Sequence, residues 1–357
     1  MDYESKIETQ VIETQNPAKP KNYRRLKMTV VALTIAGIAL FAYFVYSVGV
    51  KLILEGIGRI GFDGFAFLMF LYFLRIVSRG YAWTLSVHEP YKLNFLDTLP
   101  AVIIGEALSS LIPLGILVSG TSKAVAVRHR VPLVVGLSSI TTENLFYSLV
   151  TGLFILFSAF AFLQGFELET GWILTIDLLI GVILALIVFA VVIIVCRWHL
   201  ISSLCGWLYN RHIGRSVLEN GRVQVKLYED LIFGFYHQYP RRFLPICLCQ
   251  VIFHVIGILE VWFVLSRISA VAPDFFSSFL LESMSRVITI VFKLIPFLIG
   301  VDEAGAQFVA QTLALGAGVG VTLAIIRKGR ILFWTAIGLI LIVRRGLSLK
   351  ELSETLK

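Results

Sequence analysis

The stretch ESMSRVITIVFKLIPFLIGVDE, residues 282–303, decides the fold because it places charged side chains inside a strongly apolar run. Its ionisable members are Glu282, Arg286, Lys293, Asp302 and Glu303, and Pro296 and Gly300 interrupt it. Ionisable groups are costly at membrane depth and by default mark a functional site. Proline interrupts helices. Non-helical backbone at membrane depth is tolerated only where it is buried in protein or lines a cavity. The stretch therefore predicts a broken membrane element inside a helical bundle.

The composition supports an all-α, polytopic transmembrane helical bundle. Of 357 residues, 57% are hydrophobic and 15% are charged, whereas soluble domains carry about 25% charged residues. We expect a cytoplasmic tail at residues 1–27, one transmembrane domain at 28–345 and a C-terminal tail at 346–357. The net charge of +8 comes from basic clusters beside apolar runs. Such clusters set topology and contact anionic lipids, so we expect no nucleic-acid partner.

Basic residues before the first apolar run predict a cytoplasmic N-terminus. Spans are predicted at residues 28–50, 62–87, 133–163, 172–196, 243–265 and 304–326, with a short one at 331–343. Residues 197–242 hold seven basic and three acidic residues, which predicts a basic amphipathic section on the cytoplasmic surface. The side of the C-terminus stays open, because Arg344 and Arg345 favour the inside and the number of spans favours the outside.

A second broken element is predicted at residues 95–120, where Glu106 and Ser109 precede Pro113. Its ends favour a re-entrant element that starts and finishes on the cytoplasmic side. Both broken elements read E-x-x-S, then Ile-Pro, then glycine, although seven residues separate Glu from Pro in the first and fourteen in the second. Paired interrupted segments are typical of inverted repeats around a transporter site. Coincidence is the alternative interpretation.

Five motifs make the chain resemble the transmembrane region of lysylphosphatidylglycerol synthases, also called the flippase-like domain family. They are GEALSSLIPLG (105–115), KAVAVRHR (123–130), TTENLFYSLVTGL (141–153), ESMSRVITIVFKLIPFLIGVDEAGAQF (282–308) and IIRKGRILFWTAIGL (325–339). The resemblance covers roughly residues 30–345. It implies a stand-alone lipid transporter or accessory protein, because the aminoacyltransferase domain of the best-known relatives has no counterpart here. The GVDEAG form also resembles members that accompany hopanoid or polyprenyl-lipid pathways.

Together with this resemblance, these observations predict a protein that moves or presents an anionic lipid across the inner membrane of a bacterium. The lipid would be a phospholipid or a polyprenyl- or hopanoid-type lipid. In this hypothesis Arg286 holds the lipid phosphate bidentately and Glu282, one turn away, orients it. The alternative is a closed structural pair. Lys293, seven residues after Arg286, would supply a second cation on nearly the same helix face. Snorkelling of Lys293 to an interface is the other interpretation.

Five further acidic or polar residues are candidates for the headgroup site. Glu106, Ser109 and Glu143 would form a polar lining, or else cap broken helices. Asp302 and Glu303 precede a helix, where acidic residues cap the N-terminus, and they could also take a proton or a cationic headgroup.

Arg75 and Arg79 lie four residues apart inside a predicted span. We expect them to snorkel toward the cytoplasmic face. Contact with Glu106 is a second interpretation.

Catalytic sequence templates for zincins, P-loop nucleotide hydrolases and serine hydrolases are absent from the chain. We therefore expect no enzyme activity, no cofactor and no metal, with transport running downhill or coupled to protons or potential. The expected partners are membrane lipids with anionic headgroups and enzymes of lipid biosynthesis. Two alternatives stay open: a membrane-embedded lipid-modifying transferase, and a non-transporting scaffold of a lipid pathway.

Overall fold

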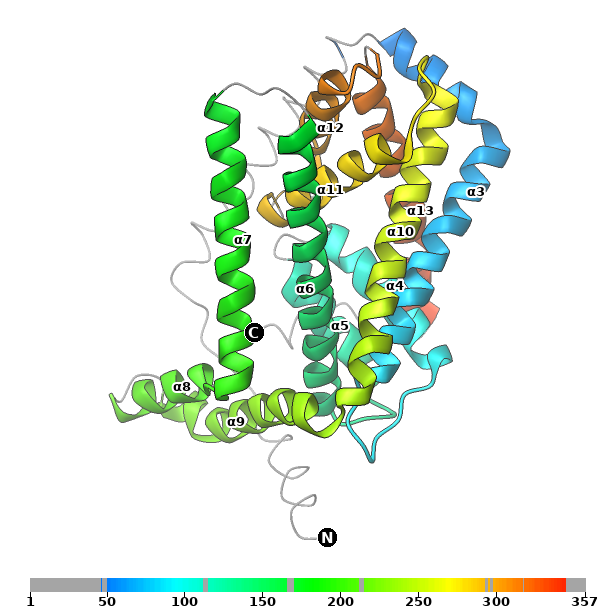
Figure 1. Cartoon of the computed structure of the whole chain (residues 1–357). Helices are drawn as coiled ribbons and strands as arrows, with labels where there is room; N and C mark the ends of the chain where they lie inside the picture. Colours follow the sequence, from blue (N-terminus) through cyan, green and yellow to red (C-terminus); the bar gives the residue numbers. More distant parts are fainter. Residues whose placement is uncertain are drawn as a thin grey trace.

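The computed structural model describes residues 46, 50–111, 115–165, 170–211, 215–292, 295, 298–316 and 318–344. These residues form helices, and no strand occurs among them, so the predicted all-α class is confirmed (Figure 1). Almost all of the predicted first span lies outside the described residues. The same holds for both predicted tails and for Pro113, Lys293 and Pro296.

The long helices are α3 (Val50–Leu85), α6 (Leu133–Gly165), α7 (Thr170–Cys196), α10 (Phe243–Ile268) and α13 (Val319–Arg344). Even 26 residues reach about 39 Å at 1.5 Å per residue, enough to cross about 30 Å of hydrocarbon. By length and hydropathy, α3, α6, α7 and α10 each contain a segment that could cross a membrane. The described part of the chain is therefore that of a multi-pass membrane protein.

Helices α4 (Phe95–Leu111) and α5 (Gly115–Ala126) pack against each other as a hairpin. Asp97, at the start of α4, lies 3.5 Å from Arg130 and 3.8 Å from His129, which follow α5. The two ends of this element are therefore neighbours, as expected for a re-entrant segment. The hairpin and α13 form one apolar core around Ile104, Ala124 and Ile342.

Helices α11 (Phe275–Val291) and α12 (Val301–Thr312) form a second hairpin. Its two ends also meet, because Ser269 Oγ donates a hydrogen bond to the Leu315 carbonyl at 3.1 Å. This hairpin lies toward the opposite end of the bundle from α8 and α9, whereas α4 and α5 lie nearer to them (Figure 1). The two broken elements therefore lie toward opposite ends of the bundle, as expected for an inverted repeat.

The predicted span at residues 304–326 is wrong. Helix α12 stops at Thr312 and the chain reverses before α13, because Gly316 and Gly318 adopt φ of 111° and 75°, which glycine tolerates without steric cost. The short span predicted at 331–343 is the second half of α13. Helix α13 ends at Arg344.

The order of long helix, hairpin and long helix occurs twice, as α3–α6 and as α10–α13. In each hairpin the first helix has 17 residues and the second has 12. This arrangement agrees with the inverted-repeat hypothesis. The sequence echo is not in register with it, since Glu106 is the twelfth residue of α4 and Glu282 the eighth of α11.

Helices α8 (Leu200–Asn210) and α9 (Arg215–Gln238) lie across one end of the bundle, and a short 3-10 helix (Pro240–Arg242) leads into α10. Helix α9 buries Ile232, Phe233 and Phe235 while presenting polar residues elsewhere, so the predicted amphipathic section is present. The buried Glu229 carboxylate accepts hydrogen bonds from the Ile201 and Ser202 amides at 2.9 and 3.2 Å. That carboxylate caps α8 and fixes it to α9.

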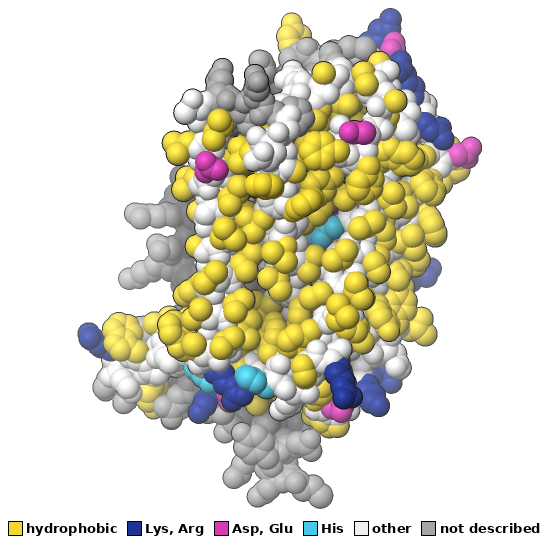
Figure 2. Space-filling model, viewed as in Figure 1, with side chains coloured by type: hydrophobic (Ala, Val, Ile, Leu, Met, Phe, Trp, Pro, Cys, Tyr) yellow, Lys and Arg dark blue, Asp and Glu magenta, His cyan; other side chains and the backbone are white. Residues whose placement is uncertain are grey.

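The surface matches a bilayer. Figure 2 shows hydrophobic side chains over the middle of the visible face, with charged side chains gathered toward its two ends. Helix α7 is the extreme case: its most apolar segment has a mean hydropathy of 3.6, and none of that window is buried in the protein. Such a helix is stable where lipid supplies the apolar surroundings.

Candidate functional site

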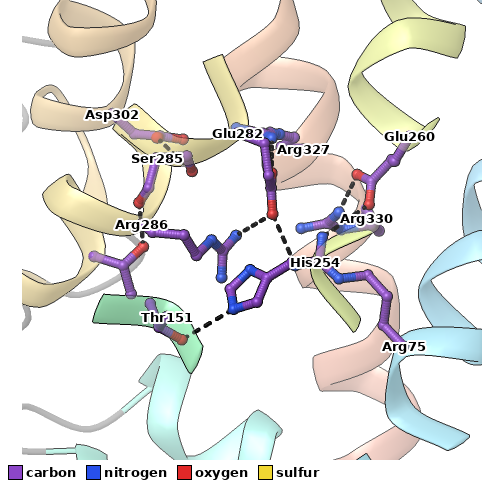
Figure 3. A network of polar contacts seen from close by, with 11 residues as sticks. Arg75, Thr151, His254, Glu260, Glu282, Ser285, Arg286, Asp302, Arg327 and Arg330 are labelled. Atoms are coloured by element: carbon purple, nitrogen blue, oxygen red, sulfur yellow. Dashed lines mark hydrogen bonds and ion pairs between the residues drawn. The ribbon is translucent and has the colours of Figure 1, made fainter. Parts of the chain in front are cut away.

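Glu282 lies at the centre of a buried ionic network. Its side chain is 0% exposed, and its Oε1 lies 2.9 Å from Arg75 Nη2 on α3 and 3.3 Å from Arg286 Nη2 on α11. Its Oε2 contacts Arg327 on α13. Three helices thus converge on one carboxylate (Figure 3). The predicted pairing of Glu282 with Arg286 is confirmed as a contact.

Glu260 on α10 extends the network. Its carboxylate lies 3.3 Å from Arg75 Nη1 and also contacts Arg330 on α13. Arg75 therefore bridges the two carboxylates (Figure 3). We call the set of Arg75, Glu260, Glu282, Arg286, Arg327 and Arg330 the Glu282 network. Among the described residues, four guanidinium groups face two carboxylates, so the formal charge of this set is 4 − 2 = +2, because arginine stays protonated in proteins.

Neighbouring residues hold these groups in place. The Arg75 guanidinium lies over the Phe253 ring at 4.2 Å, and that of Arg330 lies over Tyr72 at 4.2 Å, both within the range of a cation–π contact. Gly257 on α10 leaves room for the central carboxylate. A Cβ there would come within 2.8 Å of Glu282 Cδ and 3.0 Å of Arg75 Nη1.

The network is largely buried, and its described residues are short of acceptors. The side chains of Arg75, Arg327 and Arg330 are 1–6% exposed, and that of Arg286 is 13% exposed. The Nε atoms of all four arginines are buried without a hydrogen-bond partner in the described part of the chain. Buried donors normally have acceptors. The set has both the surplus charge and the free donors that an anion would satisfy.

His254 borders this network from α10. Its Nε2 lies 3.0 Å from Thr151 Oγ1 on α6, and its ring stacks on Phe154 with 4.5 Å between centroids. Its Nδ1 is another buried nitrogen without a hydrogen-bond partner among the described residues. Figure 3 shows the ring between Thr151 and the arginines.

A second network surrounds Arg79, one helical turn after Arg75. Arg79 Nη2 lies 2.9 Å from Glu143 Oε2, and its Nη1 lies 3.2 Å from Glu106 Oε1. Asn144 Oδ1 also accepts from Arg79, at 2.9 Å. The expected snorkelling of Arg75 and Arg79 is wrong, because each is neutralised by carboxylates inside the bundle. The alternative contact with Glu106 is confirmed for Arg79.

The Arg79 network is balanced. Lys123 on α5 is 4% exposed and interacts electrostatically with Arg79, Glu106 and Glu143. Gln250 on α10 donates a hydrogen bond to Glu143 Oε1 at 2.9 Å. The two cations of this network, Arg79 and Lys123, match the two carboxylates of Glu106 and Glu143. Counted over these four described side chains, its formal charge is zero.

Asp302 and Glu303 form a third group with Lys328 on α13. Glu303 Oε1 lies 2.6 Å from Lys328 Nζ, and Asp302 Oδ2 lies 3.9 Å from it. Glu303 Oε2 also accepts a hydrogen bond at 2.8 Å from the backbone amide of Gly300, the N-cap of α12. The predicted capping role is confirmed for Glu303. Asp302 Oδ1 instead faces Ser285 Oγ at 3.5 Å.

The remaining predicted residues lie apart from these contacts. Ser109 is half-buried on α4 and belongs to neither network in the described part of the chain. Lys293 lies outside the described residues. Glu260, Arg327 and Arg330 were missed by sequence reasoning. Their signal was the one used for Glu282, a charged residue inside or next to an apolar run.

Comparison with known proteins agrees with this architecture. The family model described as the lysylphosphatidylglycerol synthase TM region matches residues 29–338, a range that contains both hairpins and every network residue. No curated protein and no solved structure gives a significant match. Because the family match covers most of the 357 residues, the chain belongs to the family of lysylphosphatidylglycerol synthase transmembrane regions.

Proposed function

We propose that the protein binds the anionic headgroup of a membrane lipid at the Glu282 network and moves or presents that lipid across a bacterial inner membrane. The observation that carries the proposal is the formal charge of +2 inside an apolar bundle. A buried charge without a partner costs several kcal/mol. An anionic headgroup would neutralise the surplus and accept hydrogen bonds from the free guanidinium nitrogens.

The fold supports movement of a lipid. Polar residues of the α11–α12 hairpin meet those of the α4–α5 hairpin through α3, where Arg75 and Arg79 lie one turn apart. The two hairpins are oriented in opposite directions, an arrangement typical of transporters with a site near the bilayer midplane. Acyl chains can remain in lipid beside the exposed apolar surface while the headgroup contacts the arginines.

We propose that the protein does no chemistry on its lipid. The arginines of the Glu282 network are suited to binding and electrostatics. Among the residues described, no three His, Cys, Asp or Glu side chains come together in a way that could hold a metal ion. The proposed partners are membrane lipids with anionic headgroups, together with enzymes of lipid biosynthesis that make or use them.

The test is headgroup accessibility in proteoliposomes. Phosphatidylglycerol with a fluorescent headgroup is reconstituted with the protein, and a membrane-impermeant reductant then reports how fast the inner leaflet becomes accessible. We expect Arg286→Gln to slow this rate about tenfold, corresponding to about 1.4 kcal/mol of lost binding. The matched control is Arg267→Gln, at an exposed arginine on α10. The proposal fails if the wild-type protein neither binds nor moves any anionic lipid.

A further inference from the structure

We propose that the headgroup bound by the Glu282 network is a terminal phosphate monoester carrying two negative charges. This inference rests on the proposed function and names the chemical class of its lipid. A phosphate monoester has three strong acceptor oxygens and approaches a charge of −2 near neutral pH. A phosphate diester, as in phosphatidylglycerol, has two free oxygens and a charge of −1.

The first argument is the charge of the groups that a headgroup would contact. Glu282 already shares Arg75, Arg286 and Arg327, and Glu260 shares Arg75 and Arg330. After both carboxylates are neutralised, two positive charges remain. A diester would leave one of them unmatched in a site that is nearly free of solvent, whereas a dianionic monoester would match both.

The second argument is the supply of donors. Four buried Nε atoms lack acceptors in the described residues, and they belong to guanidinium groups from α3, α11 and α13. Guanidinium forks bind phosphate oxygens in pairs. A terminal phosphate presents its three oxygens in different directions and can accept from arginines on several helices at once. A diester turns two of its four oxygens into ester links.

The third group reduces this surplus only from a distance. Asp302, Glu303 and Lys328 carry a net charge of −1, and their described ion pairs are with each other rather than with the four arginines. Coulomb energy falls with separation. The charges of the groups in contact with the headgroup therefore matter most for matching its charge. The Arg79 network shows that a buried cluster in this fold can be balanced, which makes the surplus at Glu282 a specific feature.

The test compares three lipids in nanodiscs that contain the purified full-length protein. Phosphatidic acid is the monoester, phosphatidylglycerol the diester and phosphatidylethanolamine the zwitterion, each present as a minor component and measured by competition with a fluorescent lipid. At pH 7.5 we expect phosphatidic acid to bind about tenfold more tightly than phosphatidylglycerol, a difference of about 1.4 kcal/mol. Phosphatidylethanolamine should not compete.

The pH dependence of binding shows whether the charge of the headgroup, rather than its shape, determines the preference. The second ionisation of a phosphate monoester has a pKa of about 6, so binding of phosphatidic acid should strengthen from pH 5.5 to 7.5. A diester does not titrate in this range, so binding of phosphatidylglycerol should stay constant. This comparison also controls for titration of the protein, including His254, which faces the arginines from α10. The other charged neighbours are Glu260, Glu282, Asp302, Glu303, Lys328 and the four arginines.

Three variants are compared by the ratio of their affinities for the two anionic lipids. Because this ratio is measured within each variant, a partial loss of folded protein does not change it. Arg286→Gln lowers the surplus from two to one and should reduce the preference for the monoester to about twofold or less, whereas Arg267→Gln, outside the network, should keep it. Arg286→Lys keeps the charge but loses the guanidinium fork, so its preference should lie between those of the other two variants. Equal affinity for both anionic lipids, without pH dependence, would overturn this inference and leave the proposed function intact. Failure of both anionic lipids to bind would overturn both proposals.

Discussion

The Arg79 network and the Glu282 network are built alike and differ in charge. Each places arginine and glutamate side chains from several helices in contact, and α3 supplies Arg75 to one and Arg79 to the other. The Arg79 network is less buried, because the Glu106 side chain is 32% exposed. The Arg79 network pairs two cations with two carboxylates. The Glu282 network combines four guanidinium groups with two carboxylates. We propose that similar residues on the same helix serve different purposes here, with the balanced network structural and the surplus network a binding site.

The difference has consequences for mutations. In the balanced network, removing any member leaves a buried charge without a partner. In the surplus network, removing an arginine lowers an existing imbalance. Stability and binding should therefore respond in opposite ways to similar substitutions.

The largest effect should come from Glu143→Gln in the balanced network. Arg79 would keep Glu106 but lose its closest carboxylate, and breaking a buried pair typically costs about 3–5 kcal/mol. Thermal unfolding in detergent measures the loss. The control is Glu89→Gln, which breaks the exposed pair with Arg242 and should cost less than about 1 kcal/mol. Equal melting of the two variants would contradict the structural assignment of the Arg79 network.

Gly257→Ala should have the next largest effect, in the surplus network. The new methyl group would overlap the Glu282 carboxylate, and overpacking a core costs about 1–3 kcal/mol. Displacement of Glu282 should also weaken lipid binding. Gly181→Ala on α7 is the matched control, because nothing lies within 4 Å of a Cβ there. A Gly257→Ala protein with normal stability and binding would show that Glu282 has room to move.

Arg286→Gln should change stability by less than about 1 kcal/mol, because Glu282 retains Arg75 and Arg327 and the surplus charge falls. Lipid binding should nevertheless drop, as described above. Melting curves and binding curves recorded on the same samples separate these outcomes. If this variant unfolds as readily as Glu143→Gln, the two networks are equivalent and the comparison is wrong.

The smallest effect concerns His88, which lies outside both networks and beyond the end of α3. Burial lowers its pKa below the ordinary 6.5, and the Arg242 charge adds to this, while a 2.5 Å contact of its Nε2 with the Leu231 carbonyl opposes the shift. The unfolded chain therefore takes up the proton first as pH falls, and the free energy of unfolding should decrease below about pH 6.5.

Melting temperatures at pH 7.5 and 5.5 check this expectation. His88→Gln should reduce the acid sensitivity, whereas His237→Gln, at an exposed histidine of α9, should leave it unchanged. An unaltered pH dependence in His88→Gln would assign the sensitivity to other groups, including those of the networks.

The predicted spans at residues 133–163, 172–196 and 243–265 agree closely with α6, α7 and α10. They could be predicted because each apolar run is continuous and polar residues mark its ends. The turn between α12 and α13 could not be predicted in the same way. It lies in an apolar, glycine-rich segment, where the same residues serve close helix packing and positive φ. Gly320 packs on the backbone of Ala306, while Gly316 and Gly318 form the turn.

The candidate site was predicted in part. Glu282 and Arg286 are four residues apart, so their contact follows from helical geometry. Arg75 and Glu282 are separated by 207 residues in the chain, and they come together because α10 packs against both α3 and α11. The charges of Glu260, Arg327 and Arg330 were visible in the sequence, but the partners that set the net charge of the cluster were not.

Helix α7 has a consequence for how this chain can evolve. Its described contact with α6 is made at Gly152, where an added Cβ would meet Ile183 and Ile187. Most of its outward positions need only to be apolar, since lipid accepts any hydrophobic shape. We therefore expect α7 to tolerate neutral drift and exchange for unrelated apolar helices, while the arginine-bearing helices accept little change.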